Sequence, residues 1–358
     1  MKGATAIINL KSLRHNLEKI QQYAPKSRLM AVVKANAYGH GLLKVAQALK
    51  DADYFSVARI EEALTLRSGG IIKPILLLEG FFSPEDLAVL QVNHIETVIH
   101  NFEQLVALEK VRLPEPIRVW MKIDTGMHRL GVRLEQADAF YQRLQNCPNV
   151  AKPIHIITHL SDVNPHHPVV TEQQIRSFDA FVQGKPGQKS IAASGAILLC
   201  PQSHRDVVRP GIALYGISPF EHFIGRDYGL LPVMTLQSPL IAVREHKAGE
   251  TVGYAGEWIS QTATFLGVLA IGYGDGYPQS APTGTPVWIN GRQVPIVGRV
   301  SMDMISVDLG RDATDKVGDR AVLWGDQLSL EKVASYIGYT AYELVSKLTG
   351  RVAISYVN

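Results

Sequence analysis

The first two-thirds of the chain alternates between short apolar runs and amphipathic stretches. Short apolar runs indicate buried strands, and longer amphipathic stretches indicate helices. Runs that are apolar throughout are typical of strands covered on both faces, as in a parallel sheet surrounded by helices. The expected strands, in chain order, are Leu29–Val33, Tyr54–Val57, Ile75–Leu78, Thr97–Ile99, Ile117–Ile123, Ile154–Thr158, Ser190–Ala193 and Asp206–Val208.

Helices are expected before the first strand and between the strands. They fall in residues 10–23, 39–50, 58–70 and 171–182, and the last of these carries the capping-box pattern Thr171 to Gln174. Eight strand-then-helix units predict an α/β fold, a (β/α)8 barrel of the TIM type. A doubly wound sheet is the alternative, but no G-x-G-x-x-G follows any of the runs, and Gly272–Tyr277 has the wrong spacing.

The pattern changes after Tyr215, where helical periodicity almost vanishes until Ser329. Glycine, proline and β-branched residues become frequent, and Asn290-Gly291 between two apolar runs predicts a hairpin with a type I′ turn. We therefore expect a barrel in residues 1–225 and a mostly β domain in residues 226–358. Further expected features are strands in 236–246, 262–274 and 304–310, a helix at Leu330–Tyr336, a turn at Tyr342–Leu348, and a run at Ala4–Leu10 that could pair with the β domain.

The composition narrows the possible partners. A formal net charge of +3 over 358 residues gives no electrostatic case for nucleic acid or a membrane surface. The longest apolar stretches are too short to span a bilayer, and the first residues lack a signal-peptide pattern. Two cysteines make no disulfide framework and no metal cluster, and the adjacent His166 and His167 lack a third ligand at suitable spacing, so we expect no metal site. These features predict a cytoplasmic protein.

Polar residues follow five of the eight expected strands. The chemistry of a barrel gathers where its strands end, so these residues should meet at one mouth. They are Lys34, then Lys122, Asp124 and Arg129, then His159, then Ser194-Gly195, and finally Arg209-Pro210-Gly211. The glycines after the last two strands let the backbone approach an anion such as a phosphate, although two ordinary turns would look the same.

Lys34 is the most informative of these residues. It follows an apolar strand directly and opens a polar, glycine-bearing loop. Burial and nearby cations lower the pKa of a lysine amine and make it a nucleophile toward an aldehyde, which is how pyridoxal phosphate is held. A surface lysine at a strand end is the structural alternative.

The stretch AVVKANAYGHG at residues 31–41 closely resembles the cofactor-lysine motif of alanine racemases, the pyridoxal-phosphate enzymes built from a barrel and a β domain. The resemblance covers essentially the whole chain. Its other blocks, in the family's order, are WMKIDTGMHRLG, ITHL, SIAASGAILL, VRPGIALYGISP, VGYAGEW, GYGDGYP, GRVSMDM and YELVSKLTGRV. Departures are small: Ala255 stands where glycine is common, and Ser301 where members carry alanine or cysteine.

The resemblance implies interconversion of L-alanine and D-alanine, which supplies D-alanine for peptidoglycan. Lys34 and Tyr254 would be the two acid/base groups, with Tyr254 reaching the site from the other subunit of a homodimer. The cofactor would contact Lys34, Tyr38, His159, Ser194, Arg209, Gly211, Ile212 and Tyr342. The substrate would contact Arg129 and Met302, and Lys122 matches a lysine that is carbamylated in some members.

The same motifs weaken three other interpretations. A non-catalytic pyridoxal-phosphate carrier would resemble the barrel alone. A decarboxylase of the same architecture would supply a cysteine and an acidic pair from its second domain, and no cysteine follows Cys200. A racemase of broad specificity would tend to carry a signal peptide and extra cysteines.

Overall fold

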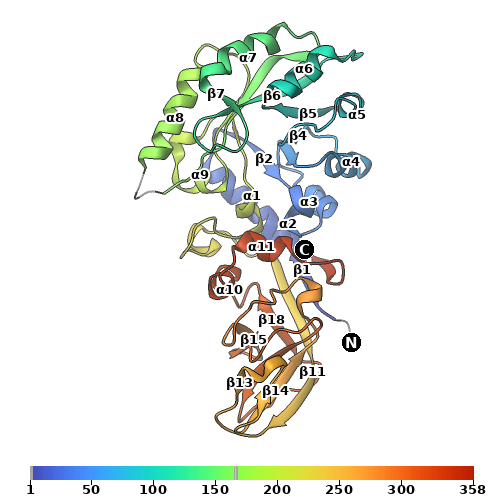
Figure 1. Ribbon diagram of the computed structural model, residues 1–358, viewed down its shortest axis with the longest axis vertical. Coiled ribbons are helices and arrows are strands. Elements are labelled where there is room, and N and C mark those ends of the chain that lie inside the picture. Colours follow the sequence, from blue (N-terminus) through green and yellow to red (C-terminus); the bar gives the residue numbers. More distant parts are fainter. Residues whose placement is uncertain (1–2, 165, 167) are drawn as a thin grey trace. The chain divides into compact units, whose positions relative to one another are not determined.

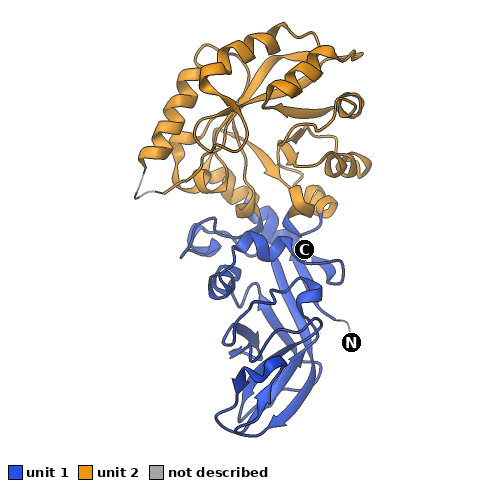
Figure 2. Ribbon diagram, viewed as in Figure 1, with its two compact units in different colours: residues 1–16, 38–41, 215–358 blue, residues 17–37, 42–214 orange. Residues whose placement is uncertain are grey.

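The structure is a computed structural model that describes residues 3–164, 166 and 168–358 (Figure 1). Its contacts divide the chain into two compact units, coloured separately in Figure 2. The barrel unit comprises residues 17–37 and 42–214, and the sheet unit comprises residues 3–16, 38–41 and 215–358. The domain limits expected from the sequence, 1–225 and 226–358, stay a prediction, and their first two residues lie outside the described ones.

Eight parallel strands form the sheet of the barrel unit. They are β2 (Arg28–Val32), β3 (Tyr54–Val57), β4 (Ile75–Leu77), β5 (Ile95–Ile99), β6 (Ile117–Asp124), β8 (Val150–Ile157), β9 (Lys189–Ser190) and β10 (Val207–Val208), with the short β7 (Val132–Arg133) paired to β6. Their spatial order is β10-β2-β3-β4-β5-β6-β8-β9. A parallel bridge between Ala193 and Arg209 joins the two ends, so the barrel predicted from the sequence is confirmed as nearly closed.

The middle of the barrel is filled by mostly apolar side chains. Seven of the eight strands each contribute one buried side chain to a single cluster: Met30, Tyr54, Leu76, Val98, Trp120, Ile157 and Val207. The indole of Trp120 donates to Glu96 Oε2 at 2.7 Å, which satisfies the one polar atom of the largest of these side chains. A filled interior leaves the strand ends as the places where a ligand can bind.

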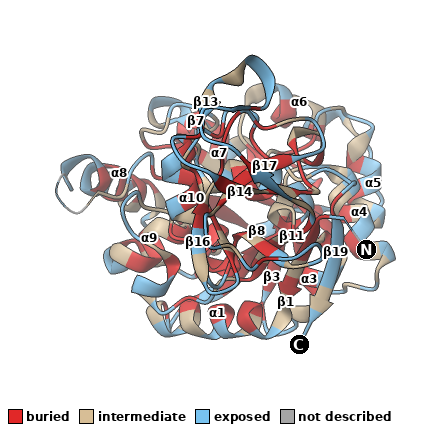
Figure 3. Cartoon of the chain, turned by 90° about the horizontal axis from the view of Figure 1, so that it is seen from below, coloured by how far each residue is buried: buried red, intermediate tan, exposed pale blue. Residues whose placement is uncertain are grey.

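Helices connect the strands. They are α1 (Leu10–Tyr23), α3 (Leu42–Ala48), α4 (Ile60–Ser68), α5 (Asp86–Val92), α6 (Phe102–Lys110), α7 (Leu134–Asn146), α8 (Val169–Val182) and α9 (Ser194–Leu199). Helix α7 buries Ala137, Phe140, Tyr141 and Leu144 at helical spacing. In Figure 3, helices such as α1 and α8 carry buried and exposed residues side by side.

The capping box expected at Thr171 is wrong. Helix α8 begins two residues earlier, at Val169, directly after Pro168. The hydroxyl of Thr171 donates to the carbonyl of Asp162 at 2.9 Å, and Gln174 accepts from the amide of Ser161 at 3.1 Å. Both side chains therefore tie the preceding loop to the helix instead of capping its first turn.

The sheet unit is built around one long strand. Its strands are β1 (Thr5–Asn9), β11 (Met234–His246), β12 (Thr251–Val252), β13 (Trp258–Ile259), β14 (Thr264–Leu269), β15 (Pro286–Ile289), β16 (Arg292–Pro295), β17 (Ile305–Gly310), β18 (Arg320–Trp324) and β19 (Ala353–Val357). Strand β11 pairs antiparallel with β1, β14 and β18. Strand β1 also pairs parallel with β19, so the pairing allowed for the first apolar run is confirmed.

Two helices complete the sheet unit. Helix α10 (Leu330–Ile337) lies where a helix was expected. The expected turn at 342–348 is instead helix α11 (Ala341–Ser346), capped by Thr340, whose hydroxyl accepts from the amide of Glu343. Within the described residues, no helix is both long enough and apolar enough to cross a bilayer.

The hairpin between β15 and β16 gives a direct test of the sheet unit's backbone. Asn290 and Gly291 have φ of 44° and 85°, as a type I′ turn requires. A methyl group on Gly291 would meet no atom within 4 Å, so Gly291→Ala changes only the backbone preference. We expect it to lower the free energy of unfolding by about 1 kcal/mol in denaturant titrations. Gly350→Ala, also in open space but without a positive φ, is the control, and equal effects would contradict this account.

Candidate active site

Lys34 follows β2 directly and opens an unusual turn. The segment α2 (Lys34–Tyr38) is one turn of left-handed helix, with φ near +53° at Ala35, Asn36 and Ala37 and +52° at Tyr38. Left-handed helical backbone costs roughly 1–2 kcal/mol per residue that is not glycine. Backbone held in this way is concentrated at functional sites, and the lysine side chain itself is half-buried at the end of the strand.

Four cationic side chains gather at this end of the barrel. Burial, followed by the charges of Arg209, Arg129 and Lys34, lowers the pKa of the Lys122 amine to about 8. The same groups act on one another because the ends of parallel strands meet around one opening. Lys34, Lys122, Arg129 and Arg209 thus lie close enough for their charges to interact, and the roles expected for them stay predictions.

His159 stands among these cations as a neutral ring. Burial, together with the charges of Arg209, Lys122, Arg129 and Lys34, lowers the pKa of its imidazole to about 3. Nη2 of Arg209 lies 3.4 Å from Nδ1 of His159. Because a guanidinium can only donate, Nδ1 is the acceptor and the ring proton sits on Nε2.

Arg209 is buried without a carboxylate among its hydrogen-bond partners in the described structure. Nη1 donates to the Ser190 hydroxyl at 2.6 Å, and Nη2 donates to the carbonyls of Thr158 at 2.7 Å and Ile191 at 3.1 Å. Burial lowers the pKa of this guanidinium. A buried cation held only by neutral acceptors is a strong attractor for an electron-rich ligand. No local pattern marks Ser190, whose contact with Arg209 depends on the way the ends of β9 and β10 lie near each other.

The loops after β9 and β10 meet through one hydroxyl. Ser194 Oγ accepts from the amides of Gly211 at 2.9 Å and Ala213 at 3.3 Å, and the side chain is buried. Ile212 begins the short helix at Ile212–Tyr215. The barrel mouth thus combines cationic side chains, neutral hydrogen-bond acceptors around Arg209, and two loops joined at Ser194. These groups fit a phosphate-bearing aldehyde such as pyridoxal phosphate.

Arg129 lies on the loop after β6, and Asp124 organises that loop. Its carboxylate accepts from the amides of Gly126 and His128, both at 3.0 Å. Burial raises the pKa of Asp124, but the hydrogen bonds from His128 and Gly126 outweigh it and hold the pKa at about 2. The carboxylate therefore stays charged, and the loop that presents the exposed Arg129 is fixed at its base.

Tyr38 and Tyr342 belong to the sheet unit, where they lie near each other. The ring centroid of Tyr38 is 4.9 Å from that of Tyr215 and 6.2 Å from that of Tyr342. Burial raises the pKa of the Tyr38 phenol, so it remains a hydrogen-bond donor. These two predicted phosphate ligands are thus brought together within one unit.

Tyr254 and Met302 also lie in the sheet unit and are largely exposed, by 70% and 52%. Tyr254 opens a short turn in which Gly253, Ala255 and Gly256 all have positive φ. Ala255 at +62° occupies the position where the resembling family commonly has glycine, and glycine adopts this backbone without strain. The carbonyl of Met302 accepts from the amide of Gly274 at 2.8 Å.

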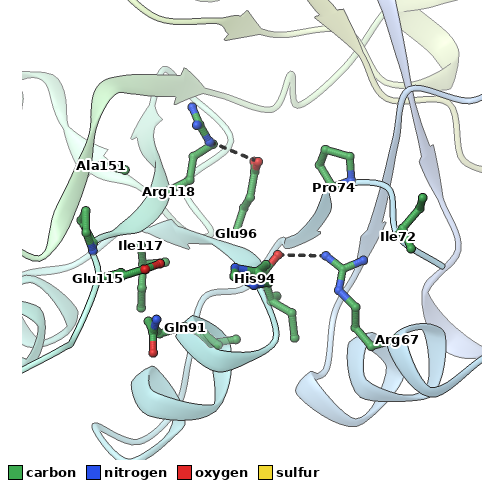
Figure 4. Close-up of a pocket in the computed structure, with 13 residues that line it drawn as sticks. Arg67, Ile72, Pro74, Gln91, His94, Glu96, Glu115, Ile117, Arg118 and Ala151 are labelled. Carbon is green, nitrogen blue, oxygen red and sulfur yellow. Dashed lines mark hydrogen bonds and ion pairs between the residues drawn. The ribbon is translucent and has the colours of Figure 1, made fainter. Parts of the chain in front are cut away.

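A cavity of about 310 Å³ opens at the amino ends of β4, β5 and β6, opposite the basic mouth of the barrel (Figure 4). Arg118 pairs with Glu96 at 3.5 Å, and Arg67 donates to the carbonyl of His94 at 2.8 Å. This end of a barrel usually serves stability.

The adjacent histidines singled out in the sequence lie on the loop before α8. His166 is exposed, and His167 lies outside the described residues. Among the described residues, no group of three or more His, Cys, Asp and Glu side chains could hold a metal ion.

The fold and this site define a barrel enzyme whose mouth is built to bind an anion beside a lysine. Residues 8–219 match the family described as "Alanine racemase, N-terminal domain", and residues 233–356 match "Alanine racemase, C-terminal domain". The chain belongs to the alanine racemase family, and it is an isomerase that acts on amino acids.

Known relatives match over the full length. The chain is 98% identical to the alanine racemase of Hamiltonella defensa, over 100% of both chains. It is 60% identical to the biosynthetic alanine racemase of Escherichia coli strain K12, again over 100% of both. The crystal structure of biosynthetic alanine racemase from Pseudomonas aeruginosa matches with a TM-score of 0.95 and 41% identity over 100% of both chains.

The lowered pKa of Lys122 predicts how stability depends on pH. Its folded pKa of about 8 lies below the ordinary value of 10.5, so the unfolded chain binds more protons between these values and stability rises with pH across that window. Lys122→Met should flatten this rise and add about 1 kcal/mol to the free energy of unfolding at pH 7, after allowance for solvent screening.

Denaturant titrations at pH 7 and pH 9 measure both effects. Lys110→Met, which removes an exposed lysine at the end of α6, is the matched control and should leave the pH slope unchanged. A Lys122→Met variant that keeps the wild-type slope would show that burial and the neighbouring cations do not lower the pKa of Lys122.

Proposed function

We propose that the chain racemises alanine with pyridoxal phosphate bound to Lys34, and that Lys34 and Tyr254 are its two acid/base groups. The observation that carries this proposal is the position of Lys34 at a barrel mouth lined by Lys122, Arg129 and Arg209. Membership of the alanine racemase family supports the substrate.

Several side chains and loops would share the binding of the cofactor. Lys34 would hold its aldehyde carbon, and Arg209 would face its ring nitrogen. Its phosphate would be held by Tyr38, Ser194, Gly211, Ile212 and Tyr342. When bound, the cofactor withdraws electrons from the substrate Cα and so makes its proton acidic. Arg209 stays charged and cannot accept a proton, so it keeps the ring nitrogen unprotonated and limits side reactions.

Racemisation needs a proton removed from one face of Cα and delivered to the other. Lys34 and Tyr254 would stand on opposite faces. A tyrosine with an ordinary pKa near ~10 is a weak base at neutral pH, so its phenolate needs support. A neutral His159 can offer Tyr254 only a hydrogen bond from Nε2, so the positive charge must come from Arg209 behind it.

Arg129 and the backbone of Met302 would bind the substrate carboxylate. Lys122 repels Arg129 as long as its amine is protonated. A pKa of about 8 leaves part of the amine neutral at neutral pH, and a neutral amine can add carbon dioxide. The resulting carbamate is an anion that would pair with Arg129 and fix its direction.

A homodimer with shared sites would explain why large apolar side chains of the sheet unit are exposed. Tyr254, Ile259, Met302 and Met304 are exposed by 70%, 48%, 52% and 45% in the single chain. Exposed apolar surface of this kind is typical of an interaction site. The second subunit would cover them, and Tyr254 would enter its partner's barrel mouth.

The product would be D-alanine for peptidoglycan synthesis, made in the cytoplasm. The names of the relatives in Escherichia coli and Pseudomonas aeruginosa describe biosynthetic alanine racemases, which supports this role.

A chiral assay of D-alanine formed from L-alanine, with pyridoxal phosphate present, tests the chemistry. Lys34→Ala should lose at least about 1,000-fold in turnover, and Tyr254→Phe about 100-fold or more, since each removes an acid/base group. Tyr336→Phe, an exposed tyrosine on α10, is the matched control. No D-alanine from loaded wild-type protein would overturn the proposal.

Mixing subunits tests whether sites are shared. If Lys34 and Tyr254 of one site come from different chains, a dimer of one Lys34→Ala and one Tyr254→Phe subunit has one intact site. Refolding the two inactive variants together at equal amounts should restore about a quarter of wild-type activity, because about half of the dimers are mixed. No recovery in mixtures that do contain mixed dimers would place both groups in one chain.

A further inference from the structure

The left-handed turn after β2 is continuous through four residues that are not glycine. The amide of Ala37 donates to the carbonyl of Val33 at 2.8 Å, which closes the turn. Right-handed backbone is favoured at each of these positions, so the turn persists only if its surroundings hold it. Because the turn begins at Lys34, the contacts that hold it also fix how Lys34 leaves the strand.

The strand side of Lys34 is anchored by the barrel itself. The amide of Val33 donates to Ser56 O, and that of Val32 to Pro210 O, both at 2.9 Å. These bonds fix the backbone up to Lys34 and leave its other side to be held by the turn.

Asn36 links the turn to the following helix. Its Oδ1 accepts from the amide of Leu42 at 2.9 Å, and Leu42 is the first residue of α3. That amide has no partner within its own helix, so a side-chain acceptor satisfies it. Asparagine also tolerates left-handed backbone better than most residues.

Glu62 links the turn to the loop after β3. Its Oε1 accepts from the amide of Asn36 at 3.4 Å. Its Oε2 accepts from the amides of Ala58 at 3.0 Å and Arg59 at 3.1 Å, where α4 begins. One carboxylate therefore joins the loop after β3 to the turn after β2, and Asn36 continues the connection to α3.

We propose that Asn36 and Glu62 are positioning residues, which hold the left-handed turn and thereby aim the Lys34 amine into the barrel mouth. The inference rests on the proposed role of Lys34. Neither side chain needs to touch the reacting atoms, because both act on the backbone that follows the lysine.

Substitutions at Asn36 separate the backbone from the side chain. Asn36→Gly permits the left-handed φ but removes the Oδ1 acceptor, whereas Asn36→Asp keeps an acceptor. Glu62→Gln keeps the shape but replaces one carboxylate oxygen with a donor. Glu61→Gln is the matched control, because Glu61 is in the same first turn of α4 and its carboxylate has no hydrogen bond to the turn among the described contacts.

Two measurements are made on each variant. Hydrogen exchange of a peptide covering residues 34–42 reports on the turn, and the visible absorbance of lysine-bound pyridoxal phosphate, titrated with the cofactor, reports on Lys34. Asn36→Gly should exchange about tenfold faster and bind the cofactor about tenfold more weakly, which corresponds to about 1.4 kcal/mol. Glu62→Gln should change both in the same direction, and Asn36→Asp and Glu61→Gln should remain near wild type.

Wild-type exchange in both Asn36→Gly and Glu62→Gln would overturn the inference, because the turn would then hold without them. Faster exchange with unchanged cofactor absorbance would also overturn it, since the residues would stabilise the turn without aiming Lys34. A wild-type protein that binds pyridoxal phosphate without any absorbance that depends on Lys34 would instead contradict the proposed function, and the exchange data would still decide whether these residues hold the turn.

Discussion

Positive charge at the carboxyl end of the barrel is the constraint around which this site is arranged. Arg209 is buried among neutral acceptors, and Lys122, Arg129 and Lys34 act on the same space. Removing charges from water is costly unless partners compensate. Strand pairing and a filled apolar interior hold the barrel together. The cationic side chains therefore cannot reduce their repulsion by moving the strand ends apart.

The same field sets the chemical state of neighbouring groups. It keeps His159 neutral and brings Lys122 near the point at which its amine gives up a proton. On the loop that presents Arg129, burial raises the pKa of Asp124, but hydrogen bonds from His128, Gly126 and Arg133 outweigh it and keep the carboxylate charged. Protonation states at the mouth are therefore coupled, and a change at one cation alters the others.

Local sequence pattern was sufficient for most of the fold. The eight barrel strands lie within a few residues of their apolar runs, and Asn290-Gly291 forms the expected turn, because period and turn chemistry are local properties. Lys34 could be singled out because it follows a strand. Thr171 bonds to Asp162 through a tertiary contact that competes with the local capping pattern. Helix α11 is only six residues long, so its periodicity is too short to separate it from a turn.

Other features of the site were beyond the sequence for physical reasons. Ser190 contacts Arg209 only because the ends of β9 and β10 lie near each other, and the left-handed turn contains alanines, a residue type that does not predict a positive φ. The hydrogen bonds of Glu62 to residues 36, 58 and 59 link the segments that follow β2 and β3. Three-dimensional neighbours of this kind have no periodic signature.

The pairing of β1 with β19 has a consequence for synthesis on the ribosome. Thr5 lies opposite Ala353, so the first strand made receives its last neighbour only when translation is almost finished. The strands of the barrel, in contrast, pair in chain order and need only residues up to 209 to close. A nascent chain can thus complete its barrel early while one edge of β1 stays unpaired, and an unpaired strand edge is a site of wrong association. Chains that terminate before residue 353 would keep that edge open permanently.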